Sequence, residues 1–207
     1  MKRLILFVLI ALQACQTKGQ SASKHISENA AVAYFASGCF WCVEAVFESV
    51  EGVYEAISGY SGGTEKNPTY RKVSYGLTSH AEAVAVYYDP TVRSFADLVS
   101  VYYASHDPTS VNRQGPDKGK QYRSIAFYQN ELEKMILESY IDSIAKYYSA
   151  PIATEIVPFE VFYPAEDYHQ DYEKNNPNDP YIRSVSIPRI NRFKSLLPEF
   201  LKENNQH

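Results

Sequence analysis

Residues 30–52 read AAVAYFASGCFWCVEAVFESVEG and predict a strand that is followed at once by a helix. The small, β-branched and aromatic side chains of residues 30–36 are typical of a buried strand, and the apolar spacing of residues 40–51 is typical of a helix. Cys39 lies between these two segments, and Cys42 lies in the first helical turn. We therefore expect a CxxC pair at the junction of a strand and a helix.

Strands and helices alternate through the rest of the chain. Further strands are predicted at residues 53–60, 81–88, 124–128 and 154–162, the last interrupted by Pro158, and further helices at residues 94–104, 130–148, 166–174 and 188–202. Ser94 and Asp97 form a capping-box pattern, and the irregular stretch 105–121 has a length that usually carries function. Because the elements interleave with only a few long crossovers, we expect an α+β fold, a two-layer sandwich of a mixed sheet and packed helices.

The composition is that of an ordinary globular protein. The chain has 207 residues, of which 45% are hydrophobic and 21% charged, and its formal net charge is −4, so disorder is not expected. Three cysteines are too few for a disulfide scaffold, and a mildly acidic chain without a basic run does not predict nucleic-acid binding. The 18 tyrosines and 10 phenylalanines predict a tyrosine-rich pocket or surface.

The N-terminus has the pattern of an export signal. Lys2 and Arg3 precede nine apolar residues, 4–12, a run shorter than the roughly 20 residues that cross a bilayer. The run ends in Leu12-Gln13-Ala14-Cys15, which resembles the lipobox of bacterial lipoproteins. Ordinary signal cleavage that leaves Cys15 unmodified is the alternative.

This pattern divides the chain into three parts. We expect residues 1–14 to be a lipoprotein-type signal peptide, Cys15 to carry the lipid, residues 15–29 to be a polar tether, and residues 30–207 to form a single catalytic domain with an extended C-terminal tail. The protein is then expected on the extracytoplasmic, periplasmic side, held to the membrane through the lipid anchor only. Nothing in the sequence predicts an oligomer, so a monomer is expected.

Cys39 and Cys42 carry the clearest chemical signal. A cysteine at a helix start meets unsatisfied backbone N–H groups and the positive end of the helix dipole, which lower its pKa, so Cys39 is predicted to be a nucleophile. Cys42 lies one turn further, within disulfide reach. The alternatives are a structural disulfide, half of a zinc site and two inert thiols. No other ligand motif completes a zinc site, so no metal is predicted, and redox catalysis is favoured.

Gly38-Cys39-Phe40-Trp41 resembles the active-site motif of the A-type peptide methionine sulfoxide reductases. Further segments match this family in the same order, from about residue 32 to residue 177: Gly59-Tyr60-Ser61-Gly62-Gly63, Asn67-Pro68-Thr69-Tyr70-Arg71, His80-Ala81-Glu82-Ala83-Val84, His106-Asp107-Pro108, Asp117 with Gln121-Tyr122-Arg123-Ser124, and Ala165-Glu166-Asp167-Tyr168-His169-Gln170. The resemblance implies a ferredoxin-like core. It also implies an enzyme, a peptide-methionine (S)-S-oxide reductase that reduces methionine S-sulfoxide in proteins, and free methionine sulfoxide as a further candidate substrate.

In this family a thiolate attacks the sulfoxide sulfur, methionine is released, and a sulfenic acid remains on the cysteine. The sulfoxide oxygen needs a carboxyl that is still protonated near neutral pH, which requires a desolvated side chain. Glu82 shares its strand face with Val84 and Val86 and has no charge partner close in sequence. A solvated acid at a strand end is the alternative. The resemblance places Glu82 at the family's catalytic acid.

The resemblance assigns the other pocket residues. Tyr70 and Tyr122 are implied to hydrogen-bond the sulfoxide oxygen, and Asp117 is implied to lie near the sulfenic acid. Phe40 and Trp41 are implied to form aromatic walls around the substrate methyl group, a use consistent with aromatic–sulfur contacts. By composition alone, each tyrosine would instead be a half-buried packing residue.

The chain departs from the family pattern that places resolving cysteines in a glycine-rich tail. No cysteine follows Cys42, which occupies a position where many members have glycine, so Cys42 is the expected resolving residue. Direct reduction of the sulfenic acid by a donor is the alternative. No cofactor is expected, because the electrons would come from a thioredoxin-like dithiol donor, which we expect to attack Cys42 as the sulfur nearer the surface.

Two other functions fit parts of the sequence. A thioredoxin-like thiol–disulfide oxidoreductase also places CxxC between a strand and a helix, but it leaves Glu82, Tyr70 and Tyr122 unexplained. A non-enzymatic lipoprotein that binds glycan or peptide through its tyrosines would retain binding after both cysteines became serine. The expected partners of the favoured function are oxidised methionine residues in proteins and the thioredoxin-like reductant.

Overall fold

The computed structural model describes residues 26–203. The predicted signal peptide, Cys15 and most of the predicted tether lie outside the described residues. Across residues 26–203, no helix is long and apolar enough to cross a membrane.

A six-stranded mixed sheet forms the centre of the fold, in the order β7-β6-β1-β3-β2-β8. Its strands are β1 (Ala31–Ser37), β2 (Val53–Ser61), β3 (Ala81–Tyr88), β6 (Ser124–Tyr128), β7 (Glu155–Pro158) and β8 (Phe162–Pro164). The pair β6 and β7 is parallel, and the other neighbours are antiparallel. With the two helices between them, β1, β2, β3 and β6 form the βαββαβ unit of a ferredoxin-like core. The α+β prediction is confirmed.

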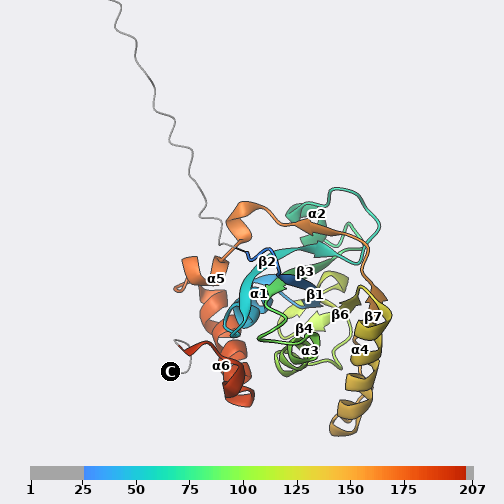
Figure 1. Cartoon of the computed structure of the whole chain (residues 1–207). Helices are drawn as coiled ribbons and strands as arrows, with labels where there is room; N and C mark the ends of the chain where they lie inside the picture. The colour runs from blue at the N-terminus through green and yellow to red at the C-terminus, as the bar shows by residue number, and fades with distance from the viewer. Residues whose placement is uncertain (1–25, 204–207) are drawn as a thin grey trace, which may run out of the picture.

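Helices cover one face of this sheet (Figure 1). They are α1 (Phe40–Glu48), α3 (Phe95–Ala104), α4 (Glu131–Ile144) and α6 (Ile187–Leu196). The first packs on β2 and β3, the second on β1 and the third on β6 and β7, while α6 contacts both α1 and α3. The predicted capping box opens α3, because the Ser94 hydroxyl accepts the Asp97 N–H and the Asp97 carboxylate accepts the Ser94 N–H.

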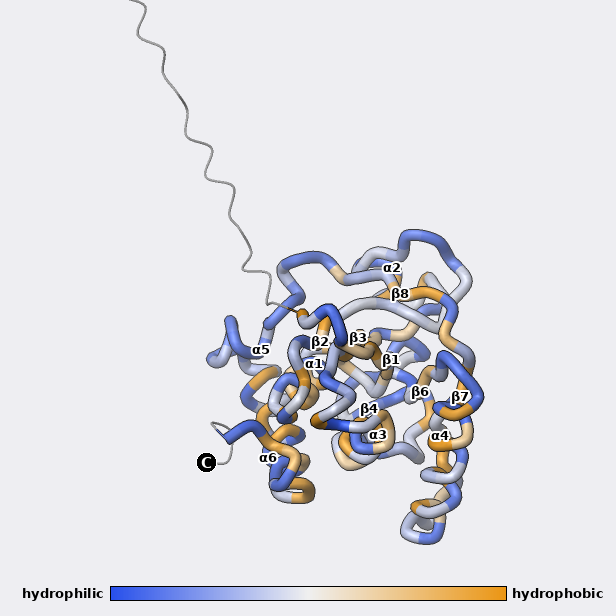
Figure 2. Tube along the Cα trace, viewed as in Figure 1, coloured by the Kyte–Doolittle hydropathy of each residue, from blue (hydrophilic) through white to orange (hydrophobic). Residues whose placement is uncertain are grey.

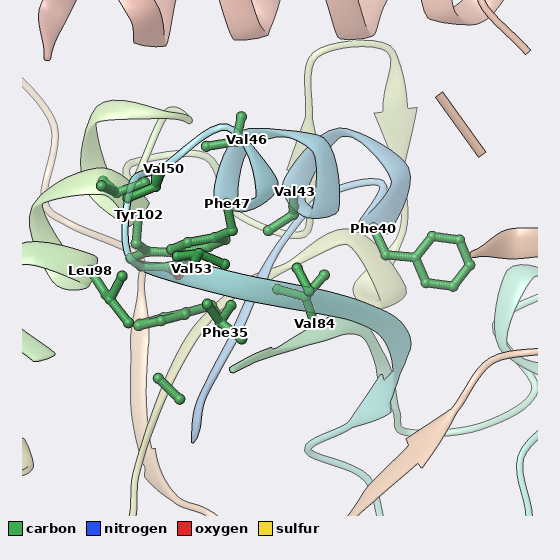
Figure 3. Close-up of a cluster of buried hydrophobic side chains, with 14 of the residues drawn as sticks. Phe35, Phe40, Val43, Val46, Phe47, Val50, Val53, Val84, Leu98 and Tyr102 are labelled. Carbon is green, nitrogen blue, oxygen red and sulfur yellow. The ribbon is translucent and has the colours of Figure 1, made fainter. Parts of the chain in front are cut away.

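The core between the helices and the sheet is aromatic and aliphatic. The Phe35 ring of β1 stacks on Phe47 of α1 at 5.2 Å and on Tyr102 of α3 at 4.9 Å between centroids, and all three side chains are fully buried. Figure 3 shows these side chains gathered together, with Phe40 at one end, pointing away from them. Figure 2 shows hydrophobic stretches along α6, whereas the short α5 (Tyr172–Asn175) is hydrophilic.

Residues 159–161 cover part of the other face. Phe159 stacks on Tyr34 of β1 at 3.7 Å between ring centroids. This segment joins β7 at one edge of the sheet to β8 at the opposite edge, so the predicted single strand 154–162 is wrong. Pro158 lacks a backbone N–H and ends β7. Gly59 of β2 leaves the space in which β8 packs, since a Cβ at this position would lie 2.3 Å from the Phe162 ring.

Several shorter elements differ from the prediction. The stretch 105–121 contains a small hairpin of β4 (Arg113–Gln114) and β5 (Asp117–Lys118), followed by a 3-10 turn, Lys120–Tyr122, and α2 (Tyr70–Ser74) was not predicted. The predicted helix 166–174 is broken, because Asp171 has a left-handed φ of 51°. The last helix starts earlier than predicted, with a π-helical turn at Ile182–Ser186, and ends at Leu196, since Pro198 begins a separate turn.

Candidate active site

A sharp turn after β1 places Cys39 at the start of α1. Gly38 makes this turn with a φ of 88°, a left-handed conformation that disfavours side chains. Cys39 is the residue immediately before the helix, and Cys42 lies one turn further along it. Both thiols are free, and Cys39 is 7% exposed. The predicted junction of strand, CxxC and helix is therefore present.

Glu82 of β3 meets the same helix start. Its side chain is 2% exposed, and its Oε2 accepts a hydrogen bond of 3.1 Å from the Phe40 N–H. Burial raises the pKa of Glu82 to about 8, with a further contribution from Asp117, and the Phe40 hydrogen bond only partly opposes this shift. Glu82 is therefore the desolvated, protonated carboxyl that the sequence predicted, whereas its catalytic role stays a prediction.

One cavity of about 240 Å³ gathers the predicted pocket residues. Seven of the nine side chains that line it were candidates from the sequence: Cys39, Phe40, Trp41, Tyr70, Glu82, Asp117 and Tyr122. They come from four separate parts of the chain, the start of α1, the start of α2, β3, and the hairpin with its following turn. The fold thus places a thiol, two carboxyls, two phenols and an aromatic wall around one space.

The two predicted phenols remain protonated donors at neutral pH. Burial raises the pKa of Tyr70 to about 12, and nearby Glu82 adds to this effect. Burial also raises the pKa of Tyr122. Glu166 anchors Tyr70, because its carboxylate accepts the Tyr70 N–H at 3.0 Å and the Tyr60 hydroxyl at 2.8 Å. The backbone that carries one phenol is therefore held to the sheet.

The tail of the chain orients the aromatic wall. The Trp41 ring stacks on Tyr172 at 3.8 Å between centroids, and its Nε1–H donates to His169 Nδ1 at 3.1 Å. The His169 ring lies 5.0 Å from the Phe40 ring. Since Nδ1 accepts this hydrogen bond, His169 is the neutral tautomer with its proton on Nε2, in agreement with a pKa that burial lowers.

Two residues that sequence reasoning missed complete the cavity, Asp179 and Tyr181. The Tyr181 hydroxyl donates to Asp117 Oδ2 at 2.6 Å and lies 4.0 Å from Cys42 Sγ. Tyr181 is one of 18 tyrosines and lies outside every matched motif, so no local pattern marks it. It reaches the site only because the tail folds back over α1.

A family model described as peptide methionine sulfoxide reductase matches residues 31–199. The chain belongs to this family. The peptide methionine sulfoxide reductase MsrA of Thermus thermophilus is 48% identical over 170 residues, which are 80% of this chain and 97% of that protein. The resemblance predicted from the motifs is thereby confirmed, and the chain is an oxidoreductase that acts on sulfur groups. The thioredoxin-like and non-enzymatic alternatives are set aside.

Solved structures of similar proteins share the fold. Mxr1 from Saccharomyces cerevisiae in its reduced form aligns with a TM-score of 0.69 and 34% identity, covering 72% of this chain and 87% of that one. Methionine sulfoxide reductase A of Corynebacterium diphtheriae aligns with a TM-score of 0.67 and 37% identity, covering 73% and 77%. Mxr1 in complex with Trx2 aligns with a TM-score of 0.51 and 24% identity, covering 70% and 85%.

The pKa values of the two thiols of this reductase are shifted in opposite directions. Burial raises the pKa of Cys39, and Cys42 and Glu82 add to the shift. A hydrogen bond from Cys39 lowers the pKa of Cys42 to about 7, and the charge of Arg189 contributes. The direction of the Cys39 shift is therefore opposite to the one expected from the helix start, whereas the role of Cys39 as the nucleophile stays a prediction. Desolvation outweighs the helix dipole at Cys39, while Cys42 faces a guanidinium group.

The relative exposure of the two sulfurs also corrects the prediction. As whole residues, Cys42 is 1% exposed and Cys39 is 7% exposed, so Cys42 is not the more exposed cysteine, contrary to the expectation that its sulfur lies nearer the surface. Cys42 is absent from the lining of the substrate-sized cavity and lines a separate one. The two sulfurs are close enough for a hydrogen bond, as the predicted disulfide reach requires, but the tail covers Cys42 through Tyr181.

One group of three carboxylates among residues 26–203 has the spacing of a metal site: Glu44, Glu48 and Asp171, with oxygen atoms within 4.8 Å of one another. Glu44 already accepts hydrogen bonds from the Ser58 hydroxyl and the Asp171 N–H. The three carboxylates line a different cavity from the one that contains Cys39. The thiol chemistry is therefore separate from this acidic cluster.

Proposed function

We propose that this chain reduces the S epimer of methionine sulfoxide in proteins to methionine, and accepts free methionine sulfoxide as well. A single observation carries the proposal: Cys39, protonated Glu82 and two phenols line the same cavity of about 240 Å³. A nucleophile, a neutral acid and oxygen-binding donors around one space are what reduction of a sulfoxide requires.

The first step transfers oxygen from the substrate to Cys39. Cys42, whose pKa is about 7, takes the Cys39 proton, and the resulting Cys39 thiolate attacks the sulfoxide sulfur. Glu82 donates its proton to the sulfoxide oxygen, which Tyr70 and Tyr122 orient. The sulfur of the substrate leaves as the thioether of methionine, and the oxygen remains on Cys39 as a sulfenic acid.

The aromatic wall selects the substrate. Phe40 and Trp41 would surround the terminal methyl group of methionine sulfoxide, and the hydrogen bond from Trp41 to His169 keeps the indole in place. With the methyl group on this wall and the oxygen on the phenols, one epimer presents its sulfur to Cys39. The other epimer would place its oxygen on the apolar wall, where it finds no donor.

The second step resolves the sulfenic acid. Cys42 attacks the Cys39 sulfur, a disulfide forms, and the hydroxyl leaves as water after it takes up the Cys42 proton. Asp117 lines the cavity beside Cys39, and the Tyr181 hydroxyl joins it to Cys42, so this pair can pass the proton. Burial raises the pKa of Asp117, which favours its uptake of a proton.

A thioredoxin-like dithiol is the proposed electron donor. The reaction balances with two thiols and a dithiol donor, and it uses no bound cofactor. The solved complex of yeast Mxr1 with Trx2 supports this type of partner, since reduced Mxr1 is 34% identical to this chain.

The proposed location follows from the N-terminal sequence. Lipid attachment at Cys15 and removal of residues 1–14 would leave a lipidated first residue, and the enzyme would act as a monomer on the extracytoplasmic side. The donor must then lie on the same side. Cys15→Ser in the full chain should move the protein from the membrane fraction to the soluble extracytoplasmic fraction, and an unchanged distribution would contradict the anchor.

Separated epimers test the function. The chain is incubated with dithiothreitol and with a peptide that contains either the S or the R epimer of methionine sulfoxide. We expect methionine from the S epimer alone. Equal turnover of both epimers, or turnover of the R epimer only, would refute the proposed geometry of the cavity.

A further inference from the structure

A second cavity, of about 160 Å³, opens onto Cys42. Cys42 lines it and Cys39 does not, whereas Cys39 lines the substrate-sized cavity and Cys42 does not. Tyr181 and Asp117 line both cavities and are hydrogen-bonded to each other, so they form the wall between them. Each sulfur of the CxxC pair therefore faces its own space.

Because a disulfide is attacked from a fixed direction, the two sulfurs would be attacked through different cavities. In thiol–disulfide exchange the incoming sulfur approaches along the extension of the S–S bond, on the side away from the leaving sulfur. Attack on Cys39 would come through the substrate cavity. Attack on Cys42 would come from a space that reaches Cys42 but not Cys39, and the second cavity is such a space.

The charges around the second cavity favour an anion. The Arg189 guanidinium donates to Ser105 O at 2.6 Å, to Ser37 O at 2.9 Å and to Ser37 Oγ at 2.9 Å. All three acceptors are neutral, so these bonds hold the guanidinium in place without cancelling its charge. Arg192, which is exposed, adds a second positive group to the lining.

The other titratable side chains that line this cavity include two carboxyls and one imidazole. Asp107 accepts the Thr109 N–H at 3.0 Å and its hydroxyl at 2.7 Å, and these bonds outweigh burial and lower its pKa, so Asp107 keeps its negative charge. Asp117 accepts the Tyr181 hydroxyl, and burial raises its pKa. Burial lowers the pKa of His106 to about 3, so this ring carries no charge. A thiolate would therefore meet two arginines and one ionised carboxylate, Asp107, near the sulfur that it must attack.

We propose that this second cavity is the port through which the thiolate of a donor reaches Cys42, separate from the methionine sulfoxide cavity. The donor thiolate attacks Cys42, a donor–Cys42 disulfide forms, and the Cys39–Cys42 bond breaks. Cys39 leaves with the electron pair as a thiolate and takes up a proton. A second donor thiol then attacks the donor sulfur and releases Cys42. The port rests on the proposed function, because it requires the Cys39–Cys42 disulfide.

Val185 offers a way to close the port. It lines the second cavity but not the first, and it is half-buried in the turn before α6. Val185→Trp should fill the space and slow reduction of the disulfide by dithiothreitol about tenfold or more, with the first release of methionine unchanged within about twofold. Arg183→Trp is the matched control, since Arg183 lies on the same turn, is exposed and lines neither cavity.

Two small thiols test the charge of the port independently. 2-Mercaptoethanesulfonate is anionic and 2-mercaptoethanol is neutral, and each forms a mixed disulfide whose position mass spectrometry can assign. The wild-type disulfide should favour the anionic thiol, and Arg192→Glu should lower the anionic-to-neutral rate ratio about threefold to tenfold at low salt. Because Arg192 is exposed, this variant tests the port even if the tryptophan variant fails to fold.

The outcomes separate the port from the function. A mixed disulfide at Cys42 with both effects above supports the port. A mixed disulfide at Cys39, an unchanged rate ratio in the arginine variant, or disulfide reduction that the well-folded tryptophan variant does not slow would overturn it while methionine release stays intact. Failure of the wild-type protein to release methionine would instead refute the proposed function.

Discussion

Replacing Glu82 by glutamine removes a proton donor and keeps the local structure. The glutamine oxygen can still accept the Phe40 N–H, which reaches the native carboxyl at 3.1 Å. The amide has nearly the volume of the carboxyl, so the buried position stays filled. Any loss of rate therefore reports the missing proton and not a collapsed helix start.

The size of the effect follows from the burial of this side chain. With a pKa of about 8, Glu82 is protonated in about 90% of molecules at pH 7, whereas a carboxyl at the ordinary value of 4.5 would be protonated in about 0.3%. Burial therefore raises the amount of available acid about 300-fold. We expect Glu82→Gln to slow the chemical step by about 10²-fold or more, with a smaller change in affinity.

The pH profile of single-turnover methionine release gives the sharpest test. The wild-type rate should rise as the thiol pair, with a pKa of about 7, loses a proton, and it should fall about fivefold between pH 7 and pH 9 as Glu82 ionises. Glu82→Gln should lose the falling limb and keep the rising one. A variant rate within about threefold of the wild type, or a falling limb that survives the substitution, would refute Glu82 as the acid.

Three further predictions follow from the same geometry. Cys39→Ser should abolish methionine release. Cys42→Ser should retain the first release, although more slowly because Cys42 is the proposed base, and should fail to form a disulfide. Rapid quench measures the release of methionine, and thiol titration measures the disulfide. Tyr70→Phe and Tyr122→Phe should each slow the chemical step less than the double change, with losses that are not additive, because the phenols share one oxygen. Glu44→Gln should flatten the decline in unfolding free energy between pH 5 and pH 8 by at most about 1.4 kcal/mol per pH unit.

The sign of the Glu44 effect comes from its raised pKa. Burial raises the pKa of Glu44 to about 8, so the folded state holds a proton that the unfolded state releases above the ordinary value of 4.5. The stability is present below pH 4.5 and is lost as the pH rises through 8. Urea unfolding at several pH values measures it, with the exposed Glu131→Gln as the control. Parallel curves for Glu44→Gln and the wild type would contradict the assignment.

Local patterns were sufficient where each element has its own signal. The boundaries of β3 and β6 agree with the predicted strands 81–88 and 124–128, because apolar runs bounded by turn residues fix their own ends. The capping box of α3 involves side chains three residues apart, so it too can be read locally. The family motifs are short and local in the same way, and seven of the nine residues around the cavity belong to them.

Contacts between distant segments decided the features that local patterns did not predict. The run 154–162 contains parts of two strands, which lie on opposite edges of the sheet. The position of β8 depends on the space that Gly59 leaves, and this space cannot be read from the run itself. Tyr181 entered the site because the tail packs back on α1.

The charge state of the CxxC pair shows the same division most clearly. The sequence predicts that the CxxC pair lies at a helix start, and this position alone indicates a low pKa for Cys39. Which sulfur is the stronger acid depends on burial by the tail and on an arginine 147 residues after Cys42, Arg189. Sequence order carries local conformation and chemical identity, whereas solvent exclusion and through-space charge exist only once the chain is folded.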